Sequence, residues 1–145
     1  KKVDLQKEYD WTEGKLLKDI LMAPTKLYFR IMDRIIKSKI EVHGIAHITG
    51  GGFYENINRI IPPNMDASIQ EGKWDVPAVF KFLQDMGNID RNEMFRVFNM
   101  GIGMVMITSP GEFGRIEGIA GELKEQVYKI GTISAGSNKV IIKES

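Results

Sequence analysis

The chain has 145 residues, of which 43% are hydrophobic, so it can bury one core within the usual size range of a single domain. Twenty basic and nineteen acidic residues leave a formal charge of +1, which argues against a nucleic-acid or membrane-surface protein. The absence of cysteine excludes disulfides and thiolate-bound zinc. No apolar stretch reaches the roughly 20 residues that span a bilayer, and no signal peptide is evident. We therefore expect a soluble, cytoplasmic protein.

The first residues are charged and do not begin with methionine. This start is typical of a fragment of a longer protein, and a processed complete protein is the alternative. We interpret residues 1–16 as a linker and residues 17–145 as one domain.

Residues 25–37 are predicted to form an amphipathic helix. Thr25 can cap its N-terminus, and charged residues occupy the side that faces solvent. The apolar positions that recur at helical spacing, and that we expect to face the core, are Leu27, Tyr28, Ile31, Met32, Ile35 and Ile36.

A strand is predicted at residues 40–49, and it ends at three consecutive glycines that precede a helix. Residues without a Cβ allow positive φ and the close approach of a ligand. Unpaired amides and the dipole at the start of a helix favour a phosphate or an oxyanion. A tight turn without a ligand has the same pattern, and spacing alone does not decide between the two. The glycines are Gly50, Gly51 and Gly52.

Two histidines lie in this strand, His43 and His47. In an extended chain they are about 13 Å apart, too far for one metal ion. His47 lies at the carboxyl end of the strand, where open sheets place their ligands, although a hydrogen-bonded structural histidine is the alternative. Glu55, Asn56 and Arg59 follow at helical spacing and could border the same pocket, or could be surface residues of a short helix.

Two prolines end the helix that follows the glycines. Polar and small residues dominate residues 64–73, which we predict to be a connecting loop. A helix is predicted to begin at residues 75–77 and to end at Gly87. Asp90 and Glu93 have the spacing of a capping box at the start of a further short helix.

After its glycines, the segment of residues 101–109 is apolar at both sets of alternate positions, which is typical of a central strand covered on both faces. Ser109 and Glu112 form a second capping box, with proline between them. Residues 127–133 and 139–143 are predicted to be two closing strands of a hairpin. The fold class is therefore α/β (α+β), a mixed sheet of about four to five strands packed with helices.

Asn99, Gly101 and Gly103 form a second cluster, at the entry to a strand with more glycine than strand propensity explains. The pattern indicates a close approach to the backbone, a bulge, or an aromatic ring from Phe95 or Phe98 over the glycines. No Ser-His-Asp or Cys-His arrangement, Walker loop or dinucleotide fingerprint is recognisable, so catalysis by this domain alone is not expected.

Three motifs together carry a family resemblance. They are LMAPTKLY at residues 21–28, GIAHITGGGFYENINRIIP at residues 44–62 and MFRVFNMGIGM at residues 94–104. In order and spacing they resemble the carboxyl-terminal half of phosphoribosylformylglycinamidine cyclo-ligase, also called AIR synthetase. The specific motifs cover residues 17–109, and the remainder agrees in pattern.

The resemblance implies ATP-dependent ring closure of formylglycinamidine ribonucleotide to 5-aminoimidazole ribonucleotide in de novo purine biosynthesis. Enzymes of this family have two α/β domains, form homodimers, and build the active site between the domains with ATP and Mg²⁺. Most of the ATP machinery belongs to the amino-terminal domain, which these residues do not include. The resemblance therefore implies that residues 1–16 are a linker from that domain and that the chain alone is inactive.

By position, the resemblance places a phosphate cradle at the three glycines, with His47 at its edge as a tentative catalytic residue. His47 could handle a proton or polarise the amide oxygen, and no residue is implied as a metal ligand. The residues implied for substrate or phosphate binding are Thr49, Gly50, Gly51, Gly52, Asn56, Arg59, Asn99, Gly101 and Gly103.

Other ATP-dependent enzymes of the same superfamily are the nearest alternatives: formylglycinamidine ribonucleotide synthetase, thiamine monophosphate kinase and selenophosphate synthetase. Their glycine motifs differ from HITGGG. A stand-alone ligand-binding or assembly domain is an alternative from another class. The coding sequence before Lys1 distinguishes it, because such a domain would have no ATP domain upstream.

Overall fold

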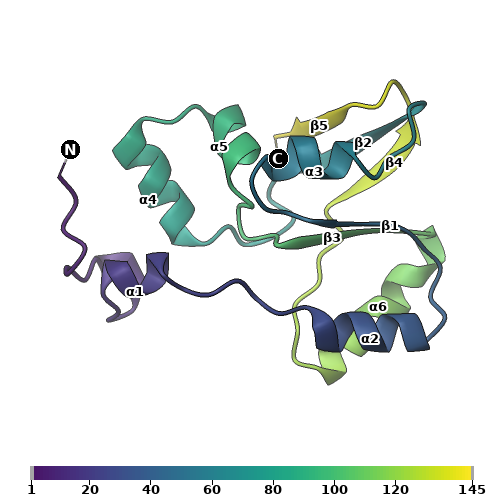
Figure 1. Ribbon diagram of the computed structural model, residues 1–145, viewed down its shortest axis with the longest axis horizontal. Coiled ribbons are helices and arrows are strands. Elements are labelled where there is room, and N and C mark those ends of the chain that lie inside the picture. The colour runs from purple at the N-terminus through teal and green to yellow at the C-terminus, as the bar shows by residue number, and fades with distance from the viewer. Residues whose placement is uncertain (1, 145) are drawn as a thin grey trace.

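The computed structural model describes residues 2–144, which form six α-helices, two 3-10 helices and five strands (Figure 1). The α/β class and the expected number of strands are confirmed, but the strands are divided between two sheets. β1 (Val42–His47) and β3 (Met104–Thr108) form an antiparallel ribbon. In the second sheet, β2 (Met65–Gln70) lies between β4 (Gly131–Ala135), which is antiparallel to it, and β5 (Val140–Lys143), which is parallel.

The β1–β3 ribbon separates two hydrophobic cores. Figure 1 shows α2 (Phe29–Lys37) and α6 (Phe113–Glu122) together on one side, and α3 (Gly52–Asn58) with the three-stranded sheet on the other. Val105 packs in the larger core and Met106 in the smaller one, because successive side chains of a strand point to opposite faces. The prediction that this strand is covered on both faces is confirmed. It is not central in its sheet, since among residues 2–144 it pairs only with β1.

Three aromatic side chains organise the larger core. Phe53 of α3 stacks on Trp74 with ring centroids 5.8 Å apart and meets Phe95 of α5 (Arg91–Val97) edge to face at 5.4 Å. All three are buried. Aromatic pairs in these geometries stabilise a core beyond the burial of their area. They hold the start of α3 against α5. The glycine motif leads directly into this start of α3.

The predicted start of the first amphipathic helix is wrong. α2 begins at Phe29 with Tyr28 as its N-cap, and Thr25 is exposed in an extended segment. Two residues predicted to face the core, Leu27 and Ile36, are 88% and 69% exposed. Only Ile35 of the predicted apolar positions is fully buried, in the smaller core.

Tertiary contacts explain this straight segment, which we call the arm (residues 22–28). Lys26 forms an ion pair with Glu125, which follows α6. Tyr28 reaches the backbone of Gly103 with its hydroxyl. Both contacts join the arm to distant parts of the chain, and they override the local helical pattern.

The predicted loop at residues 64–73 is also wrong, because it contains β2. Ala67 and Ile69 are buried at alternate positions, as a strand requires. The predicted hairpin of the last two strands is also wrong, because β2 lies between β4 and β5 in the sheet. The connection between them is instead fixed to β2: the Asp66 carboxylate accepts the backbone N–H groups of Ser137 at 2.7 Å and Lys139 at 2.8 Å.

The three helices that follow β2 lie where the sequence predicts them. α4 (Ala78–Gly87) ends at the predicted glycine, and the Asp90 side chain caps α5 by accepting backbone N–H groups. A 3-10 turn, η2 (Pro110–Glu112), leads into α6, but the side chain of Ser109 does not cap it. No helix within residues 2–144 has both the length and the apolar character needed to cross a membrane.

The N-terminal part of the chain contacts α4. After the short 3-10 turn η1 (Asp10–Thr12) comes α1 (Leu17–Leu21), whose first residue is fully buried. The rings of Tyr9 and Trp11 lie 4.9 Å and 5.2 Å from the ring of Phe82. Part of the segment interpreted as a linker is therefore packed against the domain.

Candidate functional site

Three segments far apart in the sequence meet where β1 ends and β3 begins. The N–H of Ile48 donates to the carbonyl of Gly103 at 2.8 Å, which joins the glycine motif to the third motif. Tyr28, at the end of the first motif, places its hydroxyl against Gly103. Its ring lies 6.0 Å from the ring of His47, edge to face. The fold thus brings the three motifs together.

The glycine turn (residues 49–52) has the backbone geometry that its sequence predicts. Gly51 has φ 91° and Gly52 has φ 53°, values that side chains rarely allow. The N–H of Gly52 donates to the carbonyl of Thr49 at 3.0 Å and closes the turn. The chain then enters α3 at once.

Packing within the fold explains two of the three glycines. A Cβ on Gly52 would lie 2.1 Å from the carbonyl oxygen of Phe95, and a Cβ on Gly51 would lie 2.6 Å from a carboxylate oxygen of Glu55. A Cβ on Gly50 would meet nothing within 4 Å. A ligand can therefore approach the backbone at Gly50, whereas the other two glycines are required by the turn itself.

Asn56 braces the turn from inside. It is only 8% exposed, and its side-chain NH₂ donates to the carbonyls of Gly52 at 2.8 Å and Gly50 at 3.2 Å. Its Oδ1 lies 3.5 Å from Arg59, whose guanidinium also pairs with Glu55 at 3.2 Å. Asn56 thus acts on the shape of the turn, and the charge of Arg59 is balanced by a neighbouring carboxylate.

A shallow hollow of about 190 Å³ lies beside the turn, and we call it the Thr49–Asn99 hollow. Thr49 and Asn99 are its two polar lining residues. Oδ1 of Asn99 accepts the N–H of Gly101 at 3.0 Å, and within residues 2–144 its NH₂ group has no partner. The full lining is Ile48, Thr49, Phe80, Val97, Phe98 and Asn99. The hollow offers a hydroxyl and an amide donor between apolar walls.

The structure also identifies what approaches the second glycine cluster. Gly101 has φ 94°, and a Cβ there would lie 2.5 Å from Cδ of Pro77. A Cβ on Gly103 would lie 2.1 Å from the hydroxyl of Tyr28. The close approach predicted for this cluster therefore comes from a proline and a tyrosine of the chain itself. Both glycines line a second cavity, of about 210 Å³, and not the Thr49–Asn99 hollow.

Tyr28 and His47 differ in their surroundings although their rings are neighbours. Burial raises the pKa of the Tyr28 hydroxyl above its ordinary value of 10.0, and the charge of Lys26 opposes this shift. His47 is exposed at the end of β1 and forms no hydrogen bond among the described residues. An exposed imidazole without a fixed partner is free to contact a ligand or another domain.

Over residues 1–144 the chain matches the family described as AIR synthase related protein, C-terminal domain. The chain belongs to this family. Members of the AIR synthase-related superfamily are typically ATP-using enzymes. Membership of this family supports a general association with purine biosynthesis and ATP binding.

Metal-ligating side chains of the AIR synthase-related domain do not cluster in the part of the chain that the structure describes. Nowhere in residues 2–144 do three or more histidine or acidic side chains gather so that they could hold an ion.

One polar cluster of the AIR synthase-related domain was missed from the sequence. Oγ of Ser109 donates to Glu41 at 2.6 Å and lies 3.0 Å from Nε2 of His43. In an acyl-transfer triad the serine donates to histidine, and the acid holds the other ring nitrogen. Here the serine proton goes to the carboxylate, and Glu41 lies 4.0 Å from the same Nε2. The exposed cluster links the start of β1 to the end of β3, which lie at the same end of the ribbon, and it does not activate a nucleophile.

Proposed function

We propose that this domain is the substrate-side half of a phosphoribosylformylglycinamidine cyclo-ligase. The reaction is the ATP-dependent closure of formylglycinamidine ribonucleotide to 5-aminoimidazole ribonucleotide, in cytoplasmic purine synthesis. One observation carries the proposal: the three motifs that resemble this enzyme family converge around Tyr28, His47 and Gly103. Residues that serve one site are expected to converge in this way.

In the proposed site, the ribose phosphate of the substrate lies at the open backbone of Gly50. The hydroxyl of Thr49 and the NH₂ of Asn99 add donors from the adjoining hollow. The carboxylate of Glu55 covers the Gly51 side of the turn and repels an anion there. We prefer the substrate phosphate to the transferred phosphate because ATP is assigned to the other domain.

The reaction needs a nucleophile, a leaving group and a proton acceptor. The formamide oxygen attacks the γ-phosphate of ATP, and ADP leaves; an internal nitrogen then attacks the activated carbon, and phosphate leaves as the ring closes. We assign His47 to proton handling near the closing ring, since a neutral imidazole can accept a proton and return it. ATP and Mg²⁺ would be held mainly by the amino-terminal domain, in a homodimer.

The glycine turn is tested in the complete enzyme with Gly50→Val. A side chain at Gly50 enters open space, so the variant should fold, whereas Gly51 and Gly52 have positive φ and any substitution there strains the backbone. We expect the KM for formylglycinamidine ribonucleotide to rise about tenfold or more, because the side chain fills the phosphate position.

The matched control is Gly111→Val, since a Cβ at Gly111 also meets nothing within 4 Å and lies outside the site. Its kinetics should equal those of the unmodified enzyme. Unchanged kinetics in a folded Gly50→Val enzyme would exclude the phosphate position.

The isolated chain tests whether ring closure requires both domains. With ATP and formylglycinamidine ribonucleotide it should form no aminoimidazole ribonucleotide, and activity should return only in the two-domain protein. Ring closure by the isolated chain contradicts the proposal. Turnover of thiamine monophosphate or selenide by the two-domain protein, without ring closure, assigns the chain to another member of the superfamily.

A further inference from the structure

The imidazole of His47 projects from the face of the ribbon that lies toward α2. Ala46 and Ile48, its neighbours in the sequence, are buried in the larger core. Because successive side chains of a strand point to opposite faces, His47 points away from that core and is exposed. Among the hydrogen bonds, ion pairs and ring contacts of residues 2–144, His47 takes part in one, the edge-to-face contact with Tyr28 (6.0 Å between centroids, 71° between planes).

The ring of Tyr28 is itself held in place. The carbonyl of Tyr28 accepts the N–H of Met32 at 3.0 Å, which makes this residue part of the first turn of α2. Its hydroxyl lies against the backbone of Gly103, and the ammonium group of Lys26 lies 5.7 Å from the ring centroid. A cation at this distance over an aromatic ring is attracted to it. The backbone, the hydroxyl and the ring of Tyr28 therefore each have a partner within the chain.

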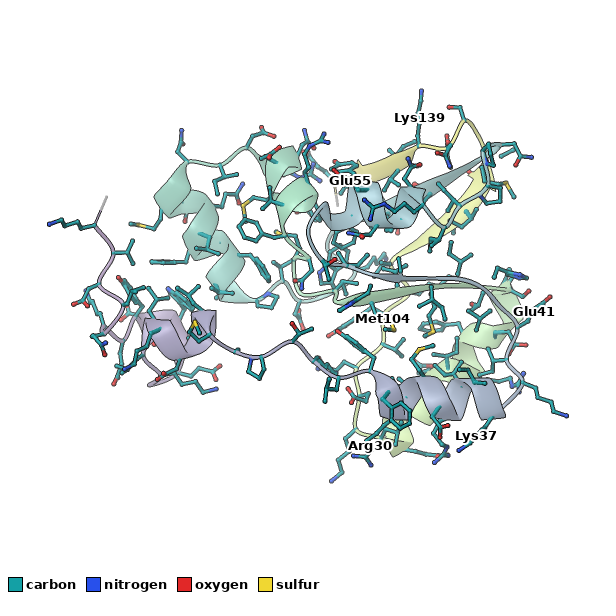
Figure 2. All side chains as sticks on the ribbon, viewed as in Figure 1. Arg30, Lys37, Glu41, Glu55, Met104 and Lys139 are labelled. Atoms are coloured by element: carbon teal, nitrogen blue, oxygen red, sulfur yellow. The ribbon has the colours of Figure 1, made fainter. Side chains whose placement is uncertain are left out.

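The backbone that seats the Tyr28 ring is bonded to the end of β1. Gly103 accepts the N–H of Ile48, the residue that follows His47. Met104 lies opposite His47 in the ribbon, and Figure 2 shows it beside the start of α2. The hydroxyl end of the ring thus rests on residues that are paired with the end of β1. The Tyr28 ring is consequently fixed relative to the backbone of His47.

A histidine that handles a proton needs a fixed orientation. An exposed side chain without a partner exchanges among several staggered rotamers, and most of them carry its polar atoms away from any one position. A misplacement of about 1 Å can lower a reaction rate about 100-fold. An edge-to-face neighbour restricts the rotamer of an imidazole without hydrogen-bonding the nitrogen that accepts a proton. The Tyr28 ring meets this need at His47.

We propose that Tyr28 is a positioning residue of the candidate site, whose ring holds the imidazole of His47 in the orientation that proton transfer requires. The proposal rests on the proposed function for the reaction that His47 serves. The ring contacts the imidazole, whereas the hydroxyl lies against Gly103. A phenylalanine at position 28 therefore suffices for the role, and a leucine does not.

The histidine resonances of the 145-residue chain test the contact. The chain has two histidines, and His43 lies beside Ser109 at the other end of the ribbon. The ring current of Tyr28 displaces the imidazole proton signals of His47 from those of an unfolded peptide. The displacement should persist in Tyr28→Phe and disappear in Tyr28→Leu, while unchanged His43 signals show that both variants fold. The same His47 signals in the unmodified chain and in Tyr28→Leu would overturn the proposal.

Kinetics of the complete enzyme test the role in the reaction. Tyr28→Leu should lower kcat for ring closure at least about tenfold, because the imidazole loses its orientation. The KM for formylglycinamidine ribonucleotide should stay within about twofold, because the phosphate position at Gly50 is unchanged. Tyr28→Phe should keep the kcat of the unmodified enzyme.

Glu125→Gln is the matched control for the position of the arm. It removes the ion pair between Lys26 and Glu125 but leaves the Tyr28 ring in the chain. Its kcat should equal that of the unmodified enzyme. If kcat falls as much in Glu125→Gln as in Tyr28→Leu, anchoring of the arm limits the reaction, and the ring contact does not.

Removal of His47 separates positioning from a structural role. In a His47→Gln enzyme the ring has no imidazole to hold, so adding Tyr28→Leu should not lower the residual kcat further. A further loss as large as that in the unmodified background contradicts the proposal, because Tyr28 would then act independently of His47. The two proposals fail differently: an unmodified two-domain protein that closes no ring refutes the proposed function, whereas an active enzyme with additive losses refutes only the role of Tyr28.

Discussion

The hydroxyl of Tyr28 occupies the space that a side chain on Gly103 would need, with 2.1 Å between the hydroxyl oxygen and the position of a Cβ. This contact joins the arm to the start of β3, across a long stretch of sequence. It also explains why a glycine lies next to a strand, where glycine is unfavourable, since a Cβ at this position leaves no room for the Tyr28 hydroxyl. The position of the arm therefore depends on the contact between Tyr28 and Gly103.

Gly103→Ala is expected to displace Tyr28 and destabilise the domain by about 1–3 kcal/mol, as overpacking does. Removing the hydroxyl leaves the ring carbon Cζ as the nearest atom, at 3.1 Å from the Cβ, so Tyr28→Phe should relieve most of the clash. A double-mutant cycle by urea unfolding measures this coupling. Additive effects of the two substitutions would mean that the contact does not form.

Tyr28 is expected to ionise at higher pH than an exposed tyrosine, because burial raises the pKa of its hydroxyl. The raised pKa favours the neutral form in the folded state. The stability it confers is complete below pH about 10, the value for an unfolded tyrosine, and is lost as pH rises through the folded pKa. Tyr28→Phe should therefore lessen alkaline destabilisation, measured by unfolding between pH 9 and 11. An equal loss of stability between pH 9 and 11 in Tyr28→Phe and in the unmodified domain would contradict the raised pKa of Tyr28.

The fold was predictable where local signals and tertiary contacts agree. Asp90 caps α5, and the apolar run of β3 is covered on both faces, as the sequence indicates. β2 was missed because Asp66, Ser68 and Gln70 make half of the strand polar, and its buried residues include a small alanine. Pairing on both sides stabilises this strand, and a single sequence does not reveal pairing between distant segments.

The residues of the site were easier to predict than their roles. The glycine turn and His47 lie as expected at the end of β1, but the pattern did not distinguish residues that shape the turn from residues that face open space. Only three-dimensional contacts make that distinction: Asn56 points into the turn, and Gly50 borders open space. The arm was missed because its contacts with Gly103 and Glu125 are remote in sequence.

Asn56→Asp is expected to destabilise the domain by about 2–4 kcal/mol near neutral pH. The substitution removes an amide donor and turns a carboxylate toward the carbonyl oxygens of the glycine turn. Protonation restores a donor, so the loss should shrink as pH falls toward 4, measured by urea unfolding at several pH values. The control is Asn58→Asp, because Asn58 is exposed on the same helix. If both variants are equally stable, Asn56 does not brace the turn.

Asp66→Asn tests the link between β2 and the segment that leads to β5. Hydrogen bonds from the backbone N–H groups of Lys139 and Ser137 lower the pKa of the Asp66 carboxyl below its ordinary value of 3.8. A lowered pKa in the folded state contributes stability above pH about 4, and this contribution is lost as pH falls through the folded pKa. The variant should therefore be less stable than the unmodified domain at pH 7, and the difference should narrow toward pH 2.

Gly136 makes this link specific, since a Cβ there would lie 2.0 Å from the carboxyl carbon of Asp66. Loss of the hydrogen bonds should also free the amides of Ser137 and Lys139, which hydrogen exchange measures directly. Asp85→Asn is the matched control, because that carboxylate lies at the surface 3.6 Å from Lys81. It should leave both amides protected. A pH-independent difference between Asp66→Asn and the unmodified domain would show that the carboxylate charge does not hold the segment, and that shape alone does.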